Sequence, residues 1–256
     1  MRKLDYIFVK PIIFYLSRLS VNIRLQFISR LISGVVSREK DPKKSLKFLL
    51  NLDQEIYSLT GIESIRYEGG LHTKHRHTKY HDFFIKNIND GDHVLDIGCG
   101  NGLLSYDIIQ NVNNVKLIGI DISKEKIETA KEKYIHPNLK FINGNALKDL
   151  PNKKFDVVIL SNVLEHFENR VEFLKQVKRR TKSSTYLVRV PLFERDWRVP
   201  LKKELGLDYR LDPTHYIEYT QEKFFEELEK VSLKVENLEI RWSEIWAVVK
   251  NHVQVQ

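Results

Sequence analysis

The pattern of apolar and polar residues changes at about residue 90 of the chain. From there on, short apolar runs alternate with amphipathic stretches of helical period, which is typical of parallel βαβ units. The last two apolar runs lie too close together for a crossover helix, so we expect them to form an antiparallel pair. The predicted strands are His93–Ile97, Val115–Asp121, Leu139–Asn143, Phe155–Leu160, Thr185–Val190, Leu233–Arg241 and Ser243–Lys250, and the predicted helices are Leu103–Gln110, Lys124–Tyr134, Asn169–Arg180 and Thr220–Lys230.

The residues before this region predict helices of a different kind. Residues 17–36 combine a narrow polar stripe with a wide apolar face, which predicts a helix whose face must be covered. Asp41 and Pro42 have the character of an N-cap and a first helical residue, and we expect that second helix to end near Gly61. We therefore divide the chain into a basic helical extension, residues 1–70, and an α/β domain, residues 71–256.

Composition narrows the class of protein. The chain has 256 residues, of which 42% are hydrophobic and 30% charged, so collagen-like and wholly disordered classes are excluded. The single cysteine, Cys99, cannot form an intramolecular disulfide and favours a reducing compartment, so we expect a cytoplasmic protein. No apolar run approaches the roughly 18 residues that a membrane span requires.

The net charge of +8 is concentrated at one end of the chain. The first 50 residues contain eleven Lys or Arg and three acidic residues, and the remainder has equal numbers of both signs. Together with the apolar face of residues 17–36, this composition suits a helix lying on an anionic membrane surface. We therefore predict that residues 1–36 bind such a surface peripherally or bind a partner chain, with docking onto the protein's own core as the alternative.

A glycine-rich segment follows the first predicted strand. Gly98, Gly100 and Gly102 permit a sharp turn and a close approach of backbone to a nucleotide-like ligand. A dinucleotide fingerprint would place a further glycine at position 103, where this chain has leucine, and Asp96 stands just before the glycines. A carboxylate there repels pyrophosphate but complements a ligand with ammonium and sulfonium charges. The segment, including Cys99, thus predicts an S-adenosylmethionine site in preference to a nicotinamide site.

Two further positions extend this predicted cofactor site. Asp121 ends the second predicted strand, where a carboxylate can accept hydrogen bonds from both ribose hydroxyls. Ile122, next to it, is assigned to the same site. Asn145 could bond an adenine edge while Ala146 leaves room for the ring, although a turn asparagine without a ligand is an equal alternative.

These residues carry a family resemblance. Val94–Gly102, with the sequence VLDIGCGNG, resembles class I S-adenosylmethionine-dependent methyltransferases of the type 11-like kind, and Asp121, Asn145 and Ser161–His166 fit the same pattern. The resemblance covers about residues 72–250 and departs from the family at Asn145, where aspartate is common. It implies a doubly wound, Rossmann-like sheet of seven strands with the last strand antiparallel, and S-adenosyl-L-methionine as cofactor. We also assign Asn162 to the cofactor site.

Residues 71–81 contain four histidines among three cationic side chains. A metal site is disfavoured there, because Lys74, Arg76 and Lys79 would repel a cation, and we expect no metal. His75 or Arg76 is instead predicted to bind the carboxylate of the methionine moiety. A solvated basic start of a helix is the alternative.

The segment from residue 191 to residue 220 is predicted to be an acceptor-side insertion. It follows the fifth strand, whose carboxyl end borders the ligand crevice, and it is rich in aromatic and charged residues. His215 is the candidate general base, with Asp212 orienting its ring, and His166 is a second candidate whose alternative role is support of the cofactor. A solvated insertion held by Arg–Asp pairs is the alternative for the whole segment.

The predicted activity is methylation of an oxygen atom in a small-molecule, glycan or lipid-linked acceptor. Nucleic acid is disfavoured, because residues 51–256 are neutral and no Asn/Asp-Pro-Pro-aromatic segment follows the fourth strand. The alternatives are an RNA or protein methyltransferase, or a cofactor-binding fold that serves as an interaction module without catalysis.

Overall fold

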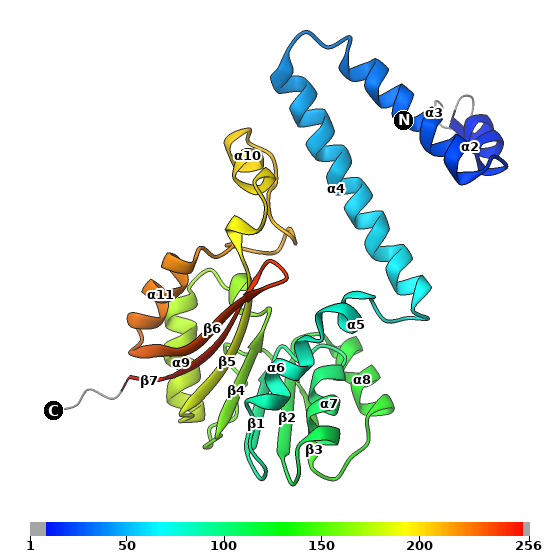
Figure 1. Ribbon diagram of the computed structural model, residues 1–256. Coiled ribbons are helices and arrows are strands. Elements are labelled where there is room, and N and C mark those ends of the chain that lie inside the picture. Colours follow the sequence, from blue (N-terminus) through cyan, green and yellow to red (C-terminus); the bar gives the residue numbers. More distant parts are fainter. Residues whose placement is uncertain (1–8, 253–256) are drawn as a thin grey trace. The chain divides into compact units, whose positions relative to one another are not determined.

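The structure is a computed structural model that describes residues 9–252, so residues 1–8 of the predicted surface-binding segment lie outside the described residues (Figure 1). The chain divides into two compact units, with the boundary between Tyr57 and Ser58. The first unit is helical, and the second contains the sheet. Each unit is described by itself below.

The first unit contains α2 (Lys10–Ser17), α3 (Val21–Val36) and the first part of α4 (Pro42–Tyr67). The prediction of a single helix from residue 17 is wrong at its start. The helical conformation is interrupted at residues 18–20, and the Ser20 side chain caps the N-terminus of α3. α4 begins as predicted, with the Asp41 carboxylate accepting a hydrogen bond from the Lys43 backbone N–H at 2.9 Å. α2 and α3 contain no buried residue.

The predicted end of α4 at Gly61 is also wrong. Gly61 lies inside the helix, where a glycine costs about 1 kcal/mol relative to alanine but does not terminate a long helix by itself. The helix ends at Tyr67, before Gly69 and Gly70, which both have positive φ. The backbone N–H of Gly70 donates to the Ile65 carbonyl at 2.8 Å, which satisfies one of the last helical carbonyls.

The second unit is built on one seven-stranded sheet with the order β3-β2-β1-β4-β5-β7-β6. β7 runs antiparallel to both of its neighbours, and β1 to β5 pair in parallel, which confirms the predicted doubly wound class. The strands are β1 (His93–Ile97), β2 (Lys116–Asp121), β3 (Leu139–Asn143), β4 (Val157–Ser161), β5 (Thr185–Pro191), β6 (Leu233–Arg241) and β7 (Glu244–Asn251).

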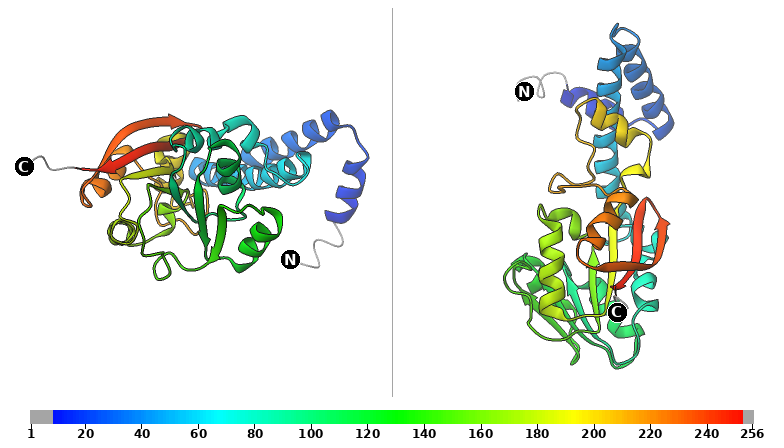
Figure 2. Two further views of the ribbon diagram at one scale, coloured as in Figure 1. Left: turned by 90° about the horizontal axis from the view of Figure 1, so that it is seen from below. Right: turned by 90° about the vertical axis from the view of Figure 1, so that its left-hand side faces the viewer.

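Helices cover both faces of the sheet (Figures 1 and 2). Phe173 and Phe224, from α9 and α11, pack in one core cluster, and Phe84 and Ile108, from α6 and α7, pack in a second. The helices of this unit beyond α4 are α5 (Lys74–Thr78), α6 (Tyr80–Lys86), α7 (Leu103–Asn111), α8 (Lys124–Lys133), α9 (Arg170–Thr181), α10 (Arg198–Glu204) and α11 (Gln221–Glu229), with short 3₁₀ turns at Leu164–His166 and Phe193–Arg195. No helix among residues 9–252 has the length and apolar character needed to cross a membrane.

The insertion between β5 and α11 is closed at its base. Leu192 and Tyr219 form a parallel β-bridge, and the backbone N–H of Phe193 donates to the Tyr219 carbonyl at 2.7 Å. The backbone N–H of Tyr219 in turn donates to the Pro191 carbonyl at 3.0 Å. The two ends of the insertion are therefore held together at the end of β5.

Candidate active site

The three glycines of the loop after β1 have different roles. All three have positive φ, at +74° for Gly98, +56° for Gly100 and +81° for Gly102. A Cβ on Gly98 would lie 2.6 Å from a methyl of Val163, and one on Gly102 would lie 2.5 Å from the ring of Phe141. Around Gly100 no heavy atom lies within 4 Å of such a Cβ. Packing within the protein therefore requires Gly98 and Gly102, and only Gly100 faces space that a ligand can fill.

Cys99 lies in the same loop, but its side chain is turned into the protein. It packs in a buried cluster with Ile127, Ala130 and Phe141, and burial raises the pKa of its thiol. Its Sγ would lie 2.8 Å from a Cβ on Gly119, which explains a glycine inside β2. Cys99 can therefore contact a cofactor through its backbone only.

Asp96 and Asp121 stand at the ends of neighbouring strands, β1 and β2. Asp96 is buried, accepts a hydrogen bond from the Ser105 hydroxyl at 2.6 Å, and has its pKa raised to about 7 by burial. The Asp121 carboxylate is half-buried and accepts hydrogen bonds from the backbone N–H groups of Gly100 at 2.9 Å and Ser123 at 2.8 Å. Asp121 therefore fixes the glycine loop as well as offering a carboxylate to a ligand.

The remaining residues assigned to the cofactor have mixed surroundings. Ile122 is 72% exposed beside Asp121, an apolar surface that an adenine ring could cover. The Asn145 side chain accepts a hydrogen bond from the Leu147 backbone N–H at 2.8 Å, so it also serves the turn, and Ala146 follows it half-buried. Asn162 follows β4 with φ +54°, and its Oδ1 is buried without a hydrogen-bond partner among the described residues.

His75 and Arg76, the two residues predicted to bind the methionine carboxylate, have different partners in the structure. The Arg76 guanidinium is paired with the Glu68 carboxylate, with the nearest N–O distance at 2.7 Å. His75 packs against Tyr80 and His81, and burial together with His81 lowers the pKa of His75 to about 4. His75 is thus neutral near pH 7, which does not support the charge-assisted bond expected of it.

A buried ion pair that the sequence did not reveal lies beside Tyr80. Arg189, in the middle of β5, forms two bonds of 2.6 and 2.7 Å with the Glu244 carboxylate of β7. Its guanidinium carbon stands 3.9 Å from the centroid of the Tyr80 ring. The register that places Arg189 opposite Trp246, and Glu244 two residues away, is a property of the antiparallel pairing.

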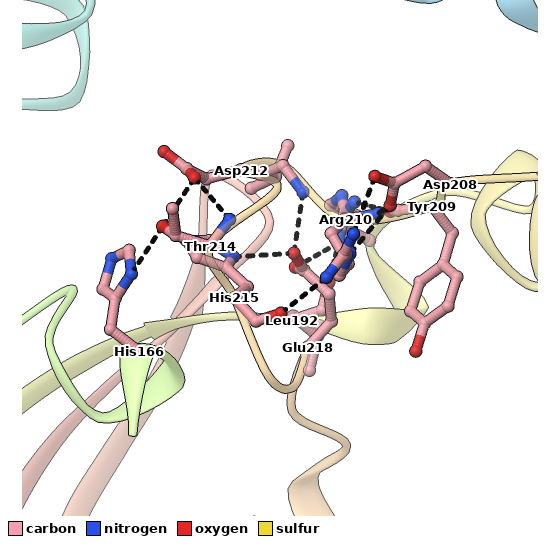
Figure 3. Close-up of polar contacts among 11 residues, drawn as sticks. His166, Leu192, Asp208, Tyr209, Arg210, Asp212, Thr214, His215 and Glu218 are labelled. Atoms are coloured by element: carbon pink, nitrogen blue, oxygen red, sulfur yellow. Dashed lines mark hydrogen bonds and ion pairs between the residues drawn. The ribbon is translucent and has the colours of Figure 1, made fainter. Parts of the chain in front are cut away.

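The insertion between β5 and α11 forms a pocket with a volume of about 900 Å³. The loop of residues 206–216 lines most of it, and His166 from the turn after β4 completes the wall. Figure 3 shows His166 beside Thr214, with His215 and Glu218 next in the loop. The structure therefore brings the two candidate catalytic histidines together, with their ring centroids 4.6 Å apart.

Asp212 does not orient His215, contrary to the prediction. Its carboxylate accepts hydrogen bonds from the backbone and hydroxyl of Thr214, at 2.8 and 2.6 Å, because a turn brings these groups within reach two residues on. The Nδ1 atom of His215 lies 2.9 Å from the carboxylate of Glu218, which also accepts from Arg195 at 2.6 Å. Glu218 therefore takes the role expected of Asp212.

Glu165 lies in the segment Ser161–His166, and the sequence assigned it no role of its own. Its side chain is fully buried at the turn after β4, and neither carboxylate oxygen has a hydrogen-bond partner among the described residues. Burial raises the pKa of Glu165 to about 8. Buried carboxyl groups without partners are rare in folded proteins and cluster at functional sites.

The sheet order, the glycine loop at the end of β1 and the carboxylate at the end of β2 define an S-adenosylmethionine-dependent methyltransferase. Residues 88–237, more than half of the chain, match the methyltransferase domain family, and the chain belongs to that family. The described residues fit the cofactor, because a Cβ on Gly100 would meet open space and the Gly100 backbone N–H bonds to the Asp121 carboxylate, whose neighbour Ile122 is exposed.

Known proteins agree with this assignment. The chain is 29% identical over 154 residues to the ubiquinone biosynthesis O-methyltransferase of Rickettsia bellii, covering 57% of this chain and 62% of that protein. It is 30% identical over 97 residues to malonyl-acyl-carrier-protein O-methyltransferase 1 of Ilyobacter polytropus, covering 38% of this chain and 36% of the relative. The alignments thus span less than two thirds of either relative's length.

A solved structure shows the same fold. Magnesium protoporphyrin IX methyltransferase from Synechocystis PCC 6803, crystallised with bound SAH, superimposes with a TM-score of 0.53 at 18% identity. The superposition covers 68% of this chain and 84% of that chain. At this identity the likeness concerns the fold alone.

Proposed function

We propose that this methyltransferase methylates an oxygen atom of a small acceptor that is free or linked to a lipid, a glycan or an acyl carrier. The observation that carries the proposal is the pocket of about 900 Å³ lined by His166 and His215. Its volume suits a small molecule. The two curated relatives named above, both O-methyltransferases, support an oxygen acceptor.

The residues of the chain supply binding, orientation and a proton acceptor. When bound, S-adenosylmethionine supplies a methyl group on a sulfonium, whose carbon–sulfur bond breaks with the electron pair remaining on sulfur. Asp121 accepts the ribose hydroxyls, and Asp96 supplies negative charge opposite the ligand's cationic groups. His215, held through Nδ1 by Glu218, accepts the proton of the acceptor hydroxyl on Nε2.

An acceptor panel with a labelled methyl donor tests this proposal. A phenolic quinone precursor must lose a proton before or during transfer, whereas the carboxylate of a malonyl acyl carrier is already ionised near pH 7. We expect transfer to the phenol to depend on His215 and transfer to the carboxylate to proceed without it. Label found in RNA or protein, and in no small acceptor, would contradict the proposal.

A second proposal concerns the first unit. We infer that α2 and α3 bind an anionic membrane surface peripherally. Ile13, Phe14 and Leu25 are each more than half exposed, and the same helices contain Lys10, Arg24 and Arg30. Burial of each large apolar side chain in the interface contributes about 1.5–3 kcal/mol. The cytoplasmic location expected from the single cysteine remains a prediction.

Flotation of the full chain with vesicles containing anionic lipid tests the membrane proposal. The variant Leu25→Asp should lose most of the bound fraction, and Asn22→Asp, with the same charge change on the same helix, should lose far less. Equal binding of both variants, or binding equal on neutral vesicles, would contradict it. A concentration-dependent dimer without lipid binding would favour a partner chain instead.

A further inference from the structure

One group of potential metal ligands occurs among the residues that the structure describes. Glu165, His166 and His215 each offer a ligand atom, and these three atoms lie within 4.8 Å of one another. Glu165 and His166 come from the turn after β4, and His215 comes from the insertion. Two histidines and one carboxylate form a donor set that binds divalent transition metals in many proteins.

The hydrogen bonds around His166 determine which ring nitrogen is free. The Thr214 hydroxyl donates its proton to the Asp212 carboxylate at 2.6 Å, so its oxygen can only accept from the His166 ring. The Nδ1 atom of His166, 2.9 Å from that oxygen, is therefore the protonated nitrogen. Figure 3 shows the contact between His166 and Thr214, and the other ring nitrogen, Nε2, therefore retains its lone pair.

His215 is fixed in the same tautomer by a different residue. Its Nδ1 lies 2.9 Å from the Glu218 carboxylate, which is an acceptor only, so Nδ1 carries the proton and Nε2 the lone pair. A second partner on the far nitrogen, a carboxylate or another oxygen, is the usual arrangement for histidines that bind metals. In the neutral form of each ring, Nε2 therefore has the lone pair that a cation requires.

Glu165 supplies the negative charge once its carboxyl group releases a proton to solvent as the cation binds. Its side chain is 0% exposed, and both of its carboxylate oxygens lack a hydrogen-bond partner among the described residues. An ionised carboxylate buried without a partner is strongly unfavourable, and a bound cation removes that cost. A buried, unpartnered carboxylate beside two imidazoles with free lone pairs is therefore an arrangement that a cation completes.

We propose that Glu165, His166 and His215 bind one divalent transition-metal cation at the inner end of the acceptor pocket. His166 and His215 both line that pocket, so acceptor oxygens can occupy the remaining coordination positions. This proposal rests on the proposed methylation and deepens it. With the cation bound, His215 serves as a ligand, and the cation lowers the pKa of the coordinated acceptor hydroxyl, whose proton passes to solvent.

Metal titration of the full chain tests the site without any assay of activity. Protein stripped with a chelator is titrated with Zn²⁺ by calorimetry, and Co²⁺ is used as a spectroscopic probe of the coordination. We expect one cation per chain. Glu165→Gln and His166→Gln should each weaken Zn²⁺ binding at least a hundredfold. Thr214→Val, which removes the hydroxyl that joins His166 to Asp212 and leaves all three ligands in place, should weaken it about tenfold. His252→Ala, an exposed histidine outside the cluster, is the matched control.

Circular dichroism and thermal unfolding establish that each variant is folded. If Glu165→Gln fails to fold, the less buried His166→Gln variant decides the question. No Zn²⁺ binding by the parent chain, or parental affinity in both folded ligand variants, would overturn the proposal. Binding that falls equally in His252→Ala would also overturn it, because the cation would then lie elsewhere.

The proposed methylation can fail independently of the cation site. Methyl transfer to a small acceptor that persists at the parental rate in excess chelator would overturn the cation's part in the reaction and leave the acceptor proposal standing. A cation bound at Glu165 in a protein that methylates no small acceptor would leave the metal site standing and contradict the acceptor proposal.

Discussion

Gly100 and Gly102 have similar backbone conformations but different surroundings, which makes the two alanine variants a matched pair. Both have positive φ, so alanine costs about 1 kcal/mol in the left-handed conformation at either position. The added Cβ of Gly102→Ala would also lie 2.5 Å from Phe141, and overpacking of this kind costs about 1–3 kcal/mol more. The added Cβ of Gly100→Ala meets no atom of the protein.

Thermal unfolding and cofactor titration should therefore separate the two variants. We expect Tm to fall by about 3 °C in Gly100→Ala and by about 10 °C in Gly102→Ala. Affinity for S-adenosylmethionine should fall at least tenfold in Gly100→Ala, because the methyl group occupies ligand space, and much less in Gly102→Ala below its unfolding transition. Equal Tm values, or parental affinity in Gly100→Ala, would refute the assignment of the open space to the cofactor.

Four further outcomes are expected. Asp121→Ala should weaken S-adenosylmethionine binding by about 2 kcal/mol, roughly thirtyfold, because ribose hydroxyls lose a charged acceptor; unchanged calorimetric affinity in a folded variant would contradict this role. Because burial raises the pKa of Asp96 to about 7, the cofactor-free protein loses the aspartate charge as pH falls, so affinity for the cationic cofactor should be about tenfold weaker at pH 6 than at pH 8. The raised pKa has the opposite effect on the cofactor-free fold, which should lose stability as pH rises from 4 to 7, as chemical denaturation at several pH values can show. His215→Ala should lower turnover of a hydroxyl acceptor about a hundredfold with little change in cofactor affinity, and parental turnover would make His215 a structural residue.

The sheet and the cofactor loop could be predicted because their signals are local. Each strand is a short apolar run, and the segment from Asp96 to Gly102 contains its whole turn in adjacent residues. The predicted start of the first helix was wrong for a local reason too, because Ser20 interrupts an apolar pattern that continues on both sides of it. The periodicity of apolar residues alone does not reveal such an N-cap.

The pocket of the insertion was less predictable because its contacts join residues that are distant in sequence. Glu165 and His215 meet only when the insertion folds back over the end of β4. Asp212 and Glu218 are the acidic residues nearest to His215 in sequence, each three positions away. Only the turn geometry decides which of the two contacts the histidine ring. Likewise, the pairing of Arg189 with Glu244 depends on strand register, which no single run of residues contains.

The closed base of the insertion makes the pairing of the strands independent of the length and sequence of the insertion. Because Tyr219 forms backbone hydrogen bonds with Pro191 and Phe193, the chain leaves the sheet and returns to it at one point, whatever lies between. Lengthening a loop between fixed ends costs little, about 0.6 kcal/mol for each doubling. Residues 196–217 can therefore diverge in length and sequence while the strands that hold the cofactor stay in register. Under the proposed function, evolution or a designer can therefore change the acceptor preference by exchanging this insertion while the sheet is kept.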